Sequence, residues 1–175
     1  MGHKKNAFTL VELLIVIIIV VILSTMVMLA GGESQAAAKA TKIVSALTNL
    51  KIFALNWYKD NSDKVDKNGK INGTDLKTYF SSSDGQDKIR KFFVGDVTIG
   101  NSGGCYEILD KNNNEGKPAW YVCYHLKSDS EHAKIKAKLE DKARESQNLF
   151  QESEGKLKTY TNGSVVYIHV ITFNY

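Results

Sequence analysis

The chain has 175 residues, enough for one domain with a sizeable hydrophobic core. Its single Pro and its charged fraction of 24% argue against a disordered chain. The net charge of +4 is small and scattered, and no basic stripe interleaved with aromatic residues indicates a nucleic-acid partner. Two cysteines are too few for a disulfide-rich scaffold, although they suffice for one bridge.

The N-terminal segment is an apolar run with a carboxylate at its head. Every residue from Leu13 to Leu23 is Leu, Ile or Val, and each contributes roughly −0.3 to −0.6 kcal/mol on an insertion scale. One acidic residue costs about 3 kcal/mol at the centre of a bilayer, so the run can insert despite Glu12. The charge is still a cost without a visible local partner, because the nearest cations, Lys4 and Lys5, precede the run.

Two simple interpretations of this segment leave Glu12 unexplained. A secretory signal peptide has an apolar stretch of about 7–15 residues and small residues at its cleavage site. Here the apolar stretch extends from Leu13 through Ala30, and Met28 occupies a position where a small residue is wanted. An uncleaved membrane anchor fits the length better, but an anchor has no use for a carboxylate near its start.

The sequence KKNA-FTLVELLIVIIIVVIL resembles the start of a type IV prepilin or a type II secretion pseudopilin. The resemblance implies cleavage between Ala7 and Phe8, followed by N-methylation of Phe8, although Ala7 stands where the family usually has Gly. It also implies that Glu12, the fifth residue of the mature chain, pairs with the N-terminal amine of a neighbouring subunit during assembly. A buried carboxylate is costly alone and tolerable when paired, which agrees with this role.

The resemblance also implies a structural, non-enzymatic role and a set of partners. These are other copies of the chain and related pilins in a helical filament, the prepilin peptidase, and an assembly platform in the inner membrane. The chain would span the bacterial cytoplasmic membrane once before assembly and lie in an extracellular or periplasmic filament afterwards. A type II secretion pseudopilin, and a minor pilin or anchored module that binds a surface ligand or DNA, remain alternatives. No cofactor is implied.

Four segments follow from this interpretation. Residues 1–7 are the cleaved leader, residues 8–30 the transmembrane or filament-core helix, residues 31–60 its amphipathic continuation, and residues 61–175 a globular α+β head. The expected fold class is therefore α+β, with a long N-terminal helix packed on an antiparallel sheet.

The amphipathic continuation is predicted from its periodicity. Apolar residues recur at steps of three and four, namely Ile43, Leu47, Leu50, Ala54 and Trp57. We expect one helix from about Phe8 to Tyr58, whose second half packs this stripe against the head.

The loop after the helix raises the question of a calcium site. The sequence NGKINGTDL resembles the second half of a dockerin-type calcium loop, which would make Asp66, Asn68 and Asp75 ligands. The first ligand position would then be Lys64, a cation where calcium needs oxygen. We therefore predict no metal here and interpret the loop as a pair of Asn-Gly turns, with calcium as the weaker alternative.

The head is predicted to contain an antiparallel sheet, because several segments are rich in β-branched and aromatic residues. They cover residues 91–100, 105–110, 119–126, 157–160 and 164–175. Both faces of the last segment are largely apolar, which is typical of a central strand covered on one side by the long helix.

The two cysteines lie in neighbouring predicted strands. If Leu109 faces Ala119, the same register sets Cys105 opposite Cys123, within bonding distance. An exported head lies in an oxidising compartment, so we predict a disulfide between them. Two buried free thiols are the alternative.

A charged helix is predicted over residues 129–152, between two of the strands. Ser128 and Glu131 form a capping box, and Ile135, Leu139 and Ala143 make a narrow apolar face.

The sequence contains little that indicates an enzyme. The four histidines have no spacing such as HExxH, and no GxSxG or Walker-type loop is present. His125 and His169 could meet across strands, but a sheet histidine with a structural role is the simpler interpretation.

Overall fold

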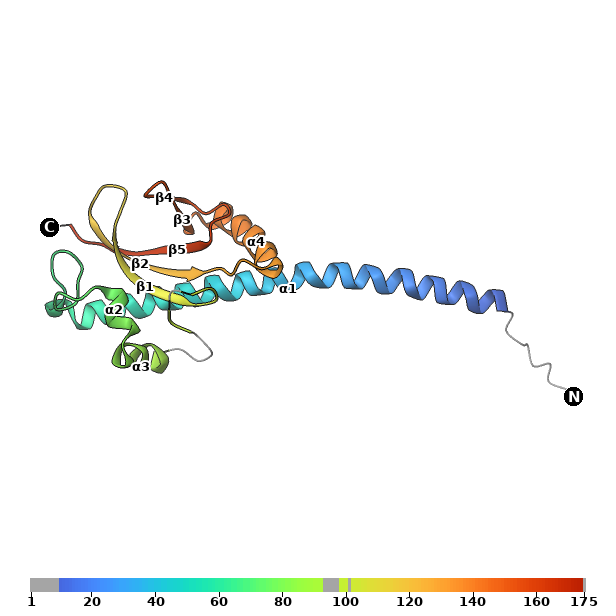
Figure 1. Cartoon of the computed structure of the whole chain (residues 1–175), viewed down its shortest axis with the longest axis horizontal. Helices are drawn as coiled ribbons and strands as arrows, with labels where there is room; N and C mark the ends of the chain where they lie inside the picture. Colours follow the sequence, from blue (N-terminus) through green and yellow to red (C-terminus); the bar gives the residue numbers. More distant parts are fainter. Residues whose placement is uncertain (1–9, 93–97, 101, 175) are drawn as a thin grey trace, which may run out of the picture. The chain divides into compact units, whose positions relative to one another are not determined.

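The computed structural model describes residues 10–92, 98–100 and 102–174, with the side chains of residues 25–31 left undescribed. The chain divides into two compact units, residues 1–35 and residues 36–175. Helix α1 (Leu10–Asp60) contributes its first part to the first unit and its second part to the second (Figure 1).

The second unit is built around a five-stranded antiparallel sheet. Its strands are β1 (Tyr106–Asn112), β2 (Pro118–His125), β3 (Phe150–Ser153), β4 (Lys156–Thr159) and β5 (Val165–Thr172). Their order in the sheet is β1-β2-β5-β3-β4, so β5 is the central strand, as its two apolar faces predict. The expected α+β fold with a helix packed on an antiparallel sheet is confirmed.

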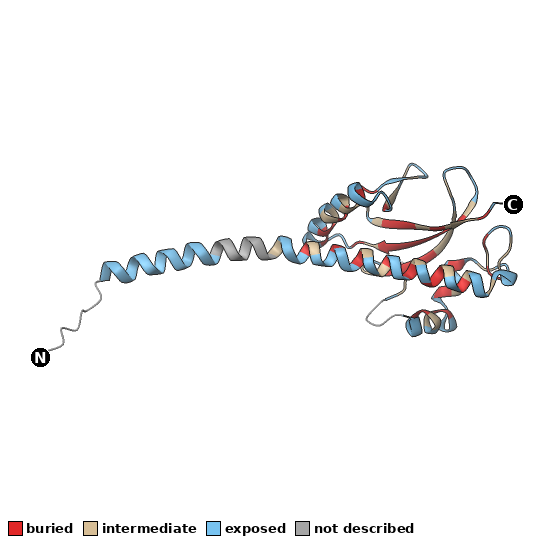
Figure 2. Ribbon diagram, turned by 180° about the vertical axis from the view of Figure 1, so that it is seen from behind, coloured by how far each residue is buried: buried red, intermediate tan, exposed pale blue. Residues whose placement is uncertain are grey.

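The part of α1 in the second unit carries the predicted apolar stripe. All five residues of the stripe are buried, with Leu47, Leu50 and Ala54 wholly inaccessible to solvent. They share one core with Ile108, Val122 and other inward-facing residues of the sheet. Figure 2 shows the buried side of this helix segment facing the strands. The 3.6-residue period was therefore a reliable guide to packing.

The opposite face of the sheet has a smaller apolar cluster. It consists of Ala119, Tyr121, Cys123 and Tyr167, with Phe150 and Leu157 of the β3–β4 hairpin packed against it. Successive residues of a strand point to opposite faces, so β2 supplies side chains to both cores. This second face is the one on which polar residues of β1 and β2 also meet, as described below.

Two helices follow α1 in the sequence and precede β1, namely α2 (Leu76–Ser81) and α3 (Ser83–Phe92). Neither was predicted from the sequence. They bury Leu76, Phe80 and Ile89 in the main core. The predicted strand over residues 91–100 is wrong at its start, because Lys91 and Phe92 belong to α3. Residues 93–97 lie outside the described residues, and Ile99 forms only an isolated bridge to Tyr106.

The predicted helix over residues 129–152 is shorter in the structure. Helix α4 extends over Ser130–Ser146 and ends at Gln147, which adopts the left-handed conformation with φ of 53°. The chain then enters β3, which the sequence prediction missed. The cap is Asp129 rather than Ser128, because Asp129 Oδ1 accepts a hydrogen bond of 2.7 Å from the His132 backbone N–H.

The β1–β2 register differs by two residues from the expected one. Leu109 faces Tyr121 instead of Ala119. The turn is centred later than expected because Gly116 takes the left-handed conformation, with φ of 77°. Asn113 Oδ1 stabilises this turn by accepting hydrogen bonds from the backbone N–H groups of Glu115 and Lys117, each at 2.9 Å. Gly adopts this conformation without steric cost, so its place in the sequence sets the register.

The loop over residues 61–75 contains the predicted Asn-Gly turns. Asn72 and Gly73 have φ of 49° and 77°, as a two-residue hairpin turn between Ile71 and Thr74 requires. Gly69, with φ of 77°, brings its carbonyl oxygen within 2.6 Å of Trp120 Nε1, which donates a hydrogen bond to it. This contact holds the loop against the sheet.

Candidate functional site

The residues expected at the processing and assembly site are only partly described. Ala7 and Phe8 lie outside the described residues. Glu12 lies in the first turn of α1, where its side chain is exposed. A carboxylate is favoured at this end of a helix, because the helix dipole leaves partial positive charge there. The structure thus leaves the expected assembly contact of Glu12 as a prediction.

The part of α1 from Leu13 to Leu23 is apolar on every side. The exposed large hydrophobic residues form an almost unbroken series: Leu10, Val11, Leu13, Leu14, Ile15, Val16, Ile17, Ile18, Ile19, Val20, Val21, Ile22 and Leu23. Their exposed fractions lie between 49% for Ile22 and 82% for Leu10. A helix that is hydrophobic all round is ordinarily buried by its surroundings. Such a surface needs a partner along its whole circumference.

In the part of the chain that the structure describes, no helix is both long enough and apolar enough to cross a membrane.

The predicted disulfide is not formed. Both cysteines are free, buried thiols. The corrected register places Glu107, not Cys105, opposite Cys123, and the Cys105 Sγ atom lies 3.1 Å from the Ser102 hydroxyl instead. The expected pairing was wrong because it depended on the centre of the β1–β2 turn.

The residues of the weak calcium alternative serve other purposes. Asp66 Oδ1 accepts hydrogen bonds from the backbone N–H groups of Asn68 and Lys70, at 2.8 and 2.9 Å. Asp75 pairs with the Lys70 ammonium group at 2.8 Å, and that carboxylate raises the Lys70 pKa. Among the described residues, the close group of three His, Cys, Asp or Glu ligand atoms does not include Asp66 or Asp75.

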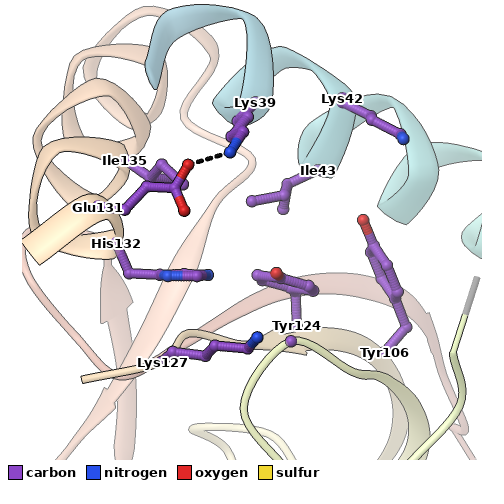
Figure 3. A pocket seen from close by; sticks show the side chains of 10 residues that line it. Lys39, Lys42, Ile43, Tyr106, Tyr124, Lys127, Glu131, His132 and Ile135 are labelled. Carbon is purple, nitrogen blue, oxygen red and sulfur yellow. Dashed lines mark hydrogen bonds and ion pairs between the residues drawn. The ribbon is translucent and has the colours of Figure 1, made fainter. Parts of the chain in front are cut away.

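A pocket of about 340 Å³ lies within the second unit, where α1, α4 and the β1–β2 layer meet (Figure 3). Among the side chains that line it are Lys39, Lys42, Lys127, Tyr106, Tyr124 and His132. Lys39 forms an ion pair with Glu131 of α4 across the pocket, as the dashed line in Figure 3 shows. Sequence analysis did not single out this pocket, because its residues come from four separate segments.

The chemistry of the pocket suits a small anionic ligand. Its two tyrosine rings lie with centroids 4.7 Å apart. Burial raises the pKa of both hydroxyls, and the neighbouring Tyr124 raises that of Tyr106 further. The hydroxyls are therefore neutral donors at pH 7, beside the side chains of three lysines. The pocket volume falls in the usual range for small-molecule sites.

A second polar group lies on the opposite face of the sheet, where sequence analysis predicted no ionisable site. The Glu107 side chain is 4% exposed and contacts both His125 and Lys77. Burial raises the Glu107 pKa, but the hydrogen bond with His125 and the contact with Lys77 outweigh burial, so the net shift is downward. The sequence signal for this group is a Glu within a predicted strand, and the wrong register concealed its partner Cys123.

His125 and His169, which the sequence allowed to meet across strands, do not lie opposite each other. His169 is opposite Tyr121, with ring centroids 5.4 Å apart, and His125 is opposite Val165. His169 Nε2 lies 2.8 Å from the Thr172 hydroxyl. Its pKa is lowered, first by burial and then by the charge of Lys51. His169 thus contacts side chains of its own sheet, and a structural role for it stays a prediction.

Comparisons with known proteins bear on the N-terminal segment. The profile of the prokaryotic N-terminal methylation motif matches residues 2–28. Neither the comparison with curated proteins nor that with solved structures gives a match. The motif implies processing by a prepilin peptidase and assembly with related pilins, and proteins of this kind are structural rather than enzymatic. At its N-terminus, the chain therefore carries the signature of the type IV pilins and pseudopilins.

Proposed function

We propose that the chain is a structural subunit of a type IV pilus or a related filament, assembled through its apolar N-terminal helix. The observation that carries this proposal is the helix surface from Leu10 to Leu23, apolar on all sides and headed by Glu12 within the methylation motif. Lipid covers this surface before assembly, and the same helix of neighbouring subunits covers it in the filament. Residues 36–175 form the part that faces solvent.

Glu12 gives the assembly its register. Cleavage between Ala7 and Phe8 exposes a new amine, and N-methylation preserves its positive charge. In the apolar filament core, this amine and the Glu12 carboxylate of a neighbouring subunit each need an opposite charge. One contact satisfies both, so each added subunit is held at a fixed axial position.

The partners follow from this mechanism. They are further copies of the chain and related pilins, the prepilin peptidase, and an assembly platform in the inner membrane. The apolar stretch from Leu13 through Ala30 holds the unassembled subunit in the cytoplasmic membrane. A pseudopilin of a type II secretion system would use the same contacts.

The pocket of Lys39, Lys42 and Lys127 favours a second candidate, a minor pilin that also binds a ligand on its solvent-facing unit. A subunit of this kind assembles through the same N-terminal helix. The pocket would therefore add a binding role to the structural one and would not replace it.

The decisive test is the substitution Glu12→Ala in the bacterium that produces the filament. We expect normal amounts of cleaved protein in the membrane fraction, because removing a carboxylate eases insertion. Filaments sheared from the surface should be lost, because leaving a buried charge unpaired costs about 3–5 kcal/mol at every subunit added. That cost corresponds to a weakening of roughly a hundredfold or more per addition.

Two further variants isolate the charge of Glu12. Glu12→Gln keeps the size of the side chain and loses the pairing, so it should also fail to form filaments. Glu33→Ala removes another exposed glutamate of the same helix and should assemble normally. Normal filament yield from Glu12→Ala, or equal loss from Glu33→Ala, would contradict a specific assembly role for Glu12.

A further inference from the structure

Three possible metal ligands lie together on the face of the sheet that is turned away from α1. Cys123 and His125 are two residues apart on β2, so their side chains share a face. Glu107 is directly opposite Cys123 on β1. The thiol, the imidazole nitrogen and one carboxylate oxygen lie within 4.8 Å of one another. We propose that Glu107, Cys123 and His125 bind a divalent cation of the zinc type.

The spacing of the three donor atoms fits a tetrahedral centre. Zinc–ligand bonds of about 2.0–2.3 Å set sulfur–nitrogen and sulfur–oxygen separations of roughly 3.5 Å and a nitrogen–oxygen separation of roughly 3.3 Å. The observed separations from Cys123 Sγ are 3.7 Å to His125 Nε2 and 3.9 Å to Glu107 Oε2. His125 Nε2 and Glu107 Oε2 are 2.9 Å apart. Small side-chain rotations bring all three to bonding distance.

The choice of cation follows from the donors. A thiolate, an imidazole and a carboxylate together match the ligand set of zinc, whereas calcium and magnesium prefer oxygen alone. On binding, the Cys123 sulfur forms a bond to the metal and its proton passes to solvent. The cation then lies between two negative groups, the thiolate and the carboxylate, and neutralises both.

The surroundings of the cluster support monodentate binding by Glu107. Lys77 Nζ lies 3.1 Å from Oε1, the oxygen that is not directed at Cys123 and His125. That oxygen is buried and has no hydrogen-bond partner among the described residues, so the ion pair is its contact. Lys77 thus orients the carboxylate from behind, as groups around metal ligands commonly do.

The site has an access route and a structural consequence. Cys123 is fully buried, while the His125 side chain is 19% exposed, so a cation would enter from the side of His125. Three protein ligands leave a fourth position for water. The bound cation would tie the edge strand β1 to β2, and through Lys77 it would involve α2 as well.

Cobalt is the probe that tests the proposal most directly. The full-length chain, without a polyhistidine tag, is purified in detergent, reduced, stripped of metal by a chelator and titrated with Co²⁺. We expect one equivalent to bind and to give a thiolate-to-cobalt charge-transfer band. Zn²⁺ should displace it and raise the melting temperature. Absence of the band in the wild-type chain would overturn the proposal and leave an ion-pair network of Glu107, His125 and Lys77.

Matched variants identify the ligands. Cys123→Ser and His125→Gln should each lose the band or weaken cobalt binding at least tenfold. Two control variants leave the cluster intact. Cys105→Ser removes the second thiol of the chain, and His169→Gln removes an imidazole of β5 that lies outside the cluster. Both should bind cobalt as the wild type does. A band that survives in Cys123→Ser but disappears in Cys105→Ser would contradict the assignment.

A measurement on the wild-type chain guards against variants that do not fold. The zinc-edge X-ray absorption spectrum of the zinc-loaded protein should show one sulfur together with nitrogen or oxygen ligands in the first shell. A first shell without sulfur would refute the site, however the variants behave.

Discussion

Single residues with unusual backbone conformations fix several contacts of the second unit. Gly69 and Gly73 both have φ of 77°, a conformation that costs other residues roughly 1–2 kcal/mol. Their surroundings differ. A Cβ atom on Gly69 would lie 2.9 Å from the Phe173 ring and 3.0 Å from Trp120 Nε1, whereas one on Gly73 would meet nothing within 4 Å.

Alanine substitutions at these two glycines separate the cost of backbone strain from the cost of crowding. Gly73→Ala should lower the free energy of unfolding by the conformational cost alone. Gly69→Ala should lower it by about 1–3 kcal/mol more, because the aromatic rings must shift and the hydrogen bond from Trp120 is disturbed. Urea unfolding of both variants, followed by tryptophan fluorescence, measures the difference. Equal losses would mean that the loop adjusts freely and that the close packing around Gly69 has no energetic weight.

At the scale of secondary-structure elements, the start of α4 illustrates how local chemistry decides between neighbouring residues. Ser128 has the sequence pattern of a cap, yet Asp129 makes the capping hydrogen bond and also contacts the His132 ring at 2.7 Å. The hydrogen bonds from the backbone and side chain of His132 lower the Asp129 pKa.

We expect Asp129→Ala to lower the melting temperature and Ser128→Ala to leave it nearly unchanged. Because the Asp129 pKa is lower in the folded chain, its contribution is present above the unfolded value of about 3.9 and is lost as the pH falls through the folded value. The difference between wild type and Asp129→Ala should therefore shrink in acid. Melting curves measured from neutral pH downward test this. A larger loss of stability in Ser128→Ala than in Asp129→Ala would instead identify Ser128 as the cap.

The elements that could be predicted from the sequence have either an apolar pattern that repeats over several turns or apolar residues on both faces of a strand. The stripe from Ile43 to Trp57 repeats over several turns, and β5 has apolar residues on both faces, so neither depended on distant contacts. Helix α3 is different. It is strongly polar and buries only Gly85 and Ile89, so its place in the fold depends on tertiary contacts.

One candidate site could be predicted from the sequence and the other could not, for a related reason. Glu12 is recognisable because the motif around it is contiguous in the sequence. The meeting of Glu107 with Cys123 depends on the β1–β2 register, which one glycine in the turn determines. The predicted Cys105–Cys123 pair failed for that same reason, since a two-residue shift replaces one partner by another.

At the scale of the whole molecule, the two units match the two tasks of the proposed filament subunit, which are assembly and presentation of a folded head. Apart from Glu12, residues 10–23 offer an apolar surface that other molecules must cover, whereas residues 36–175 bury their own core. Substitutions in one unit should affect the other little, because distant sites act nearly independently. Assembly defects and stability defects should therefore arise from different residues.

The measurement that tests the filament account most directly is the mass of the N-terminal peptide of the mature protein, isolated from the bacterium that makes it. The account predicts a chain that begins at Phe8, lacks residues 1–7 and carries one methyl group on its amine. A mature chain that begins near Gly31 would indicate an ordinary secretory signal. That start, or an intact Met1 in the assembled material, would contradict the account.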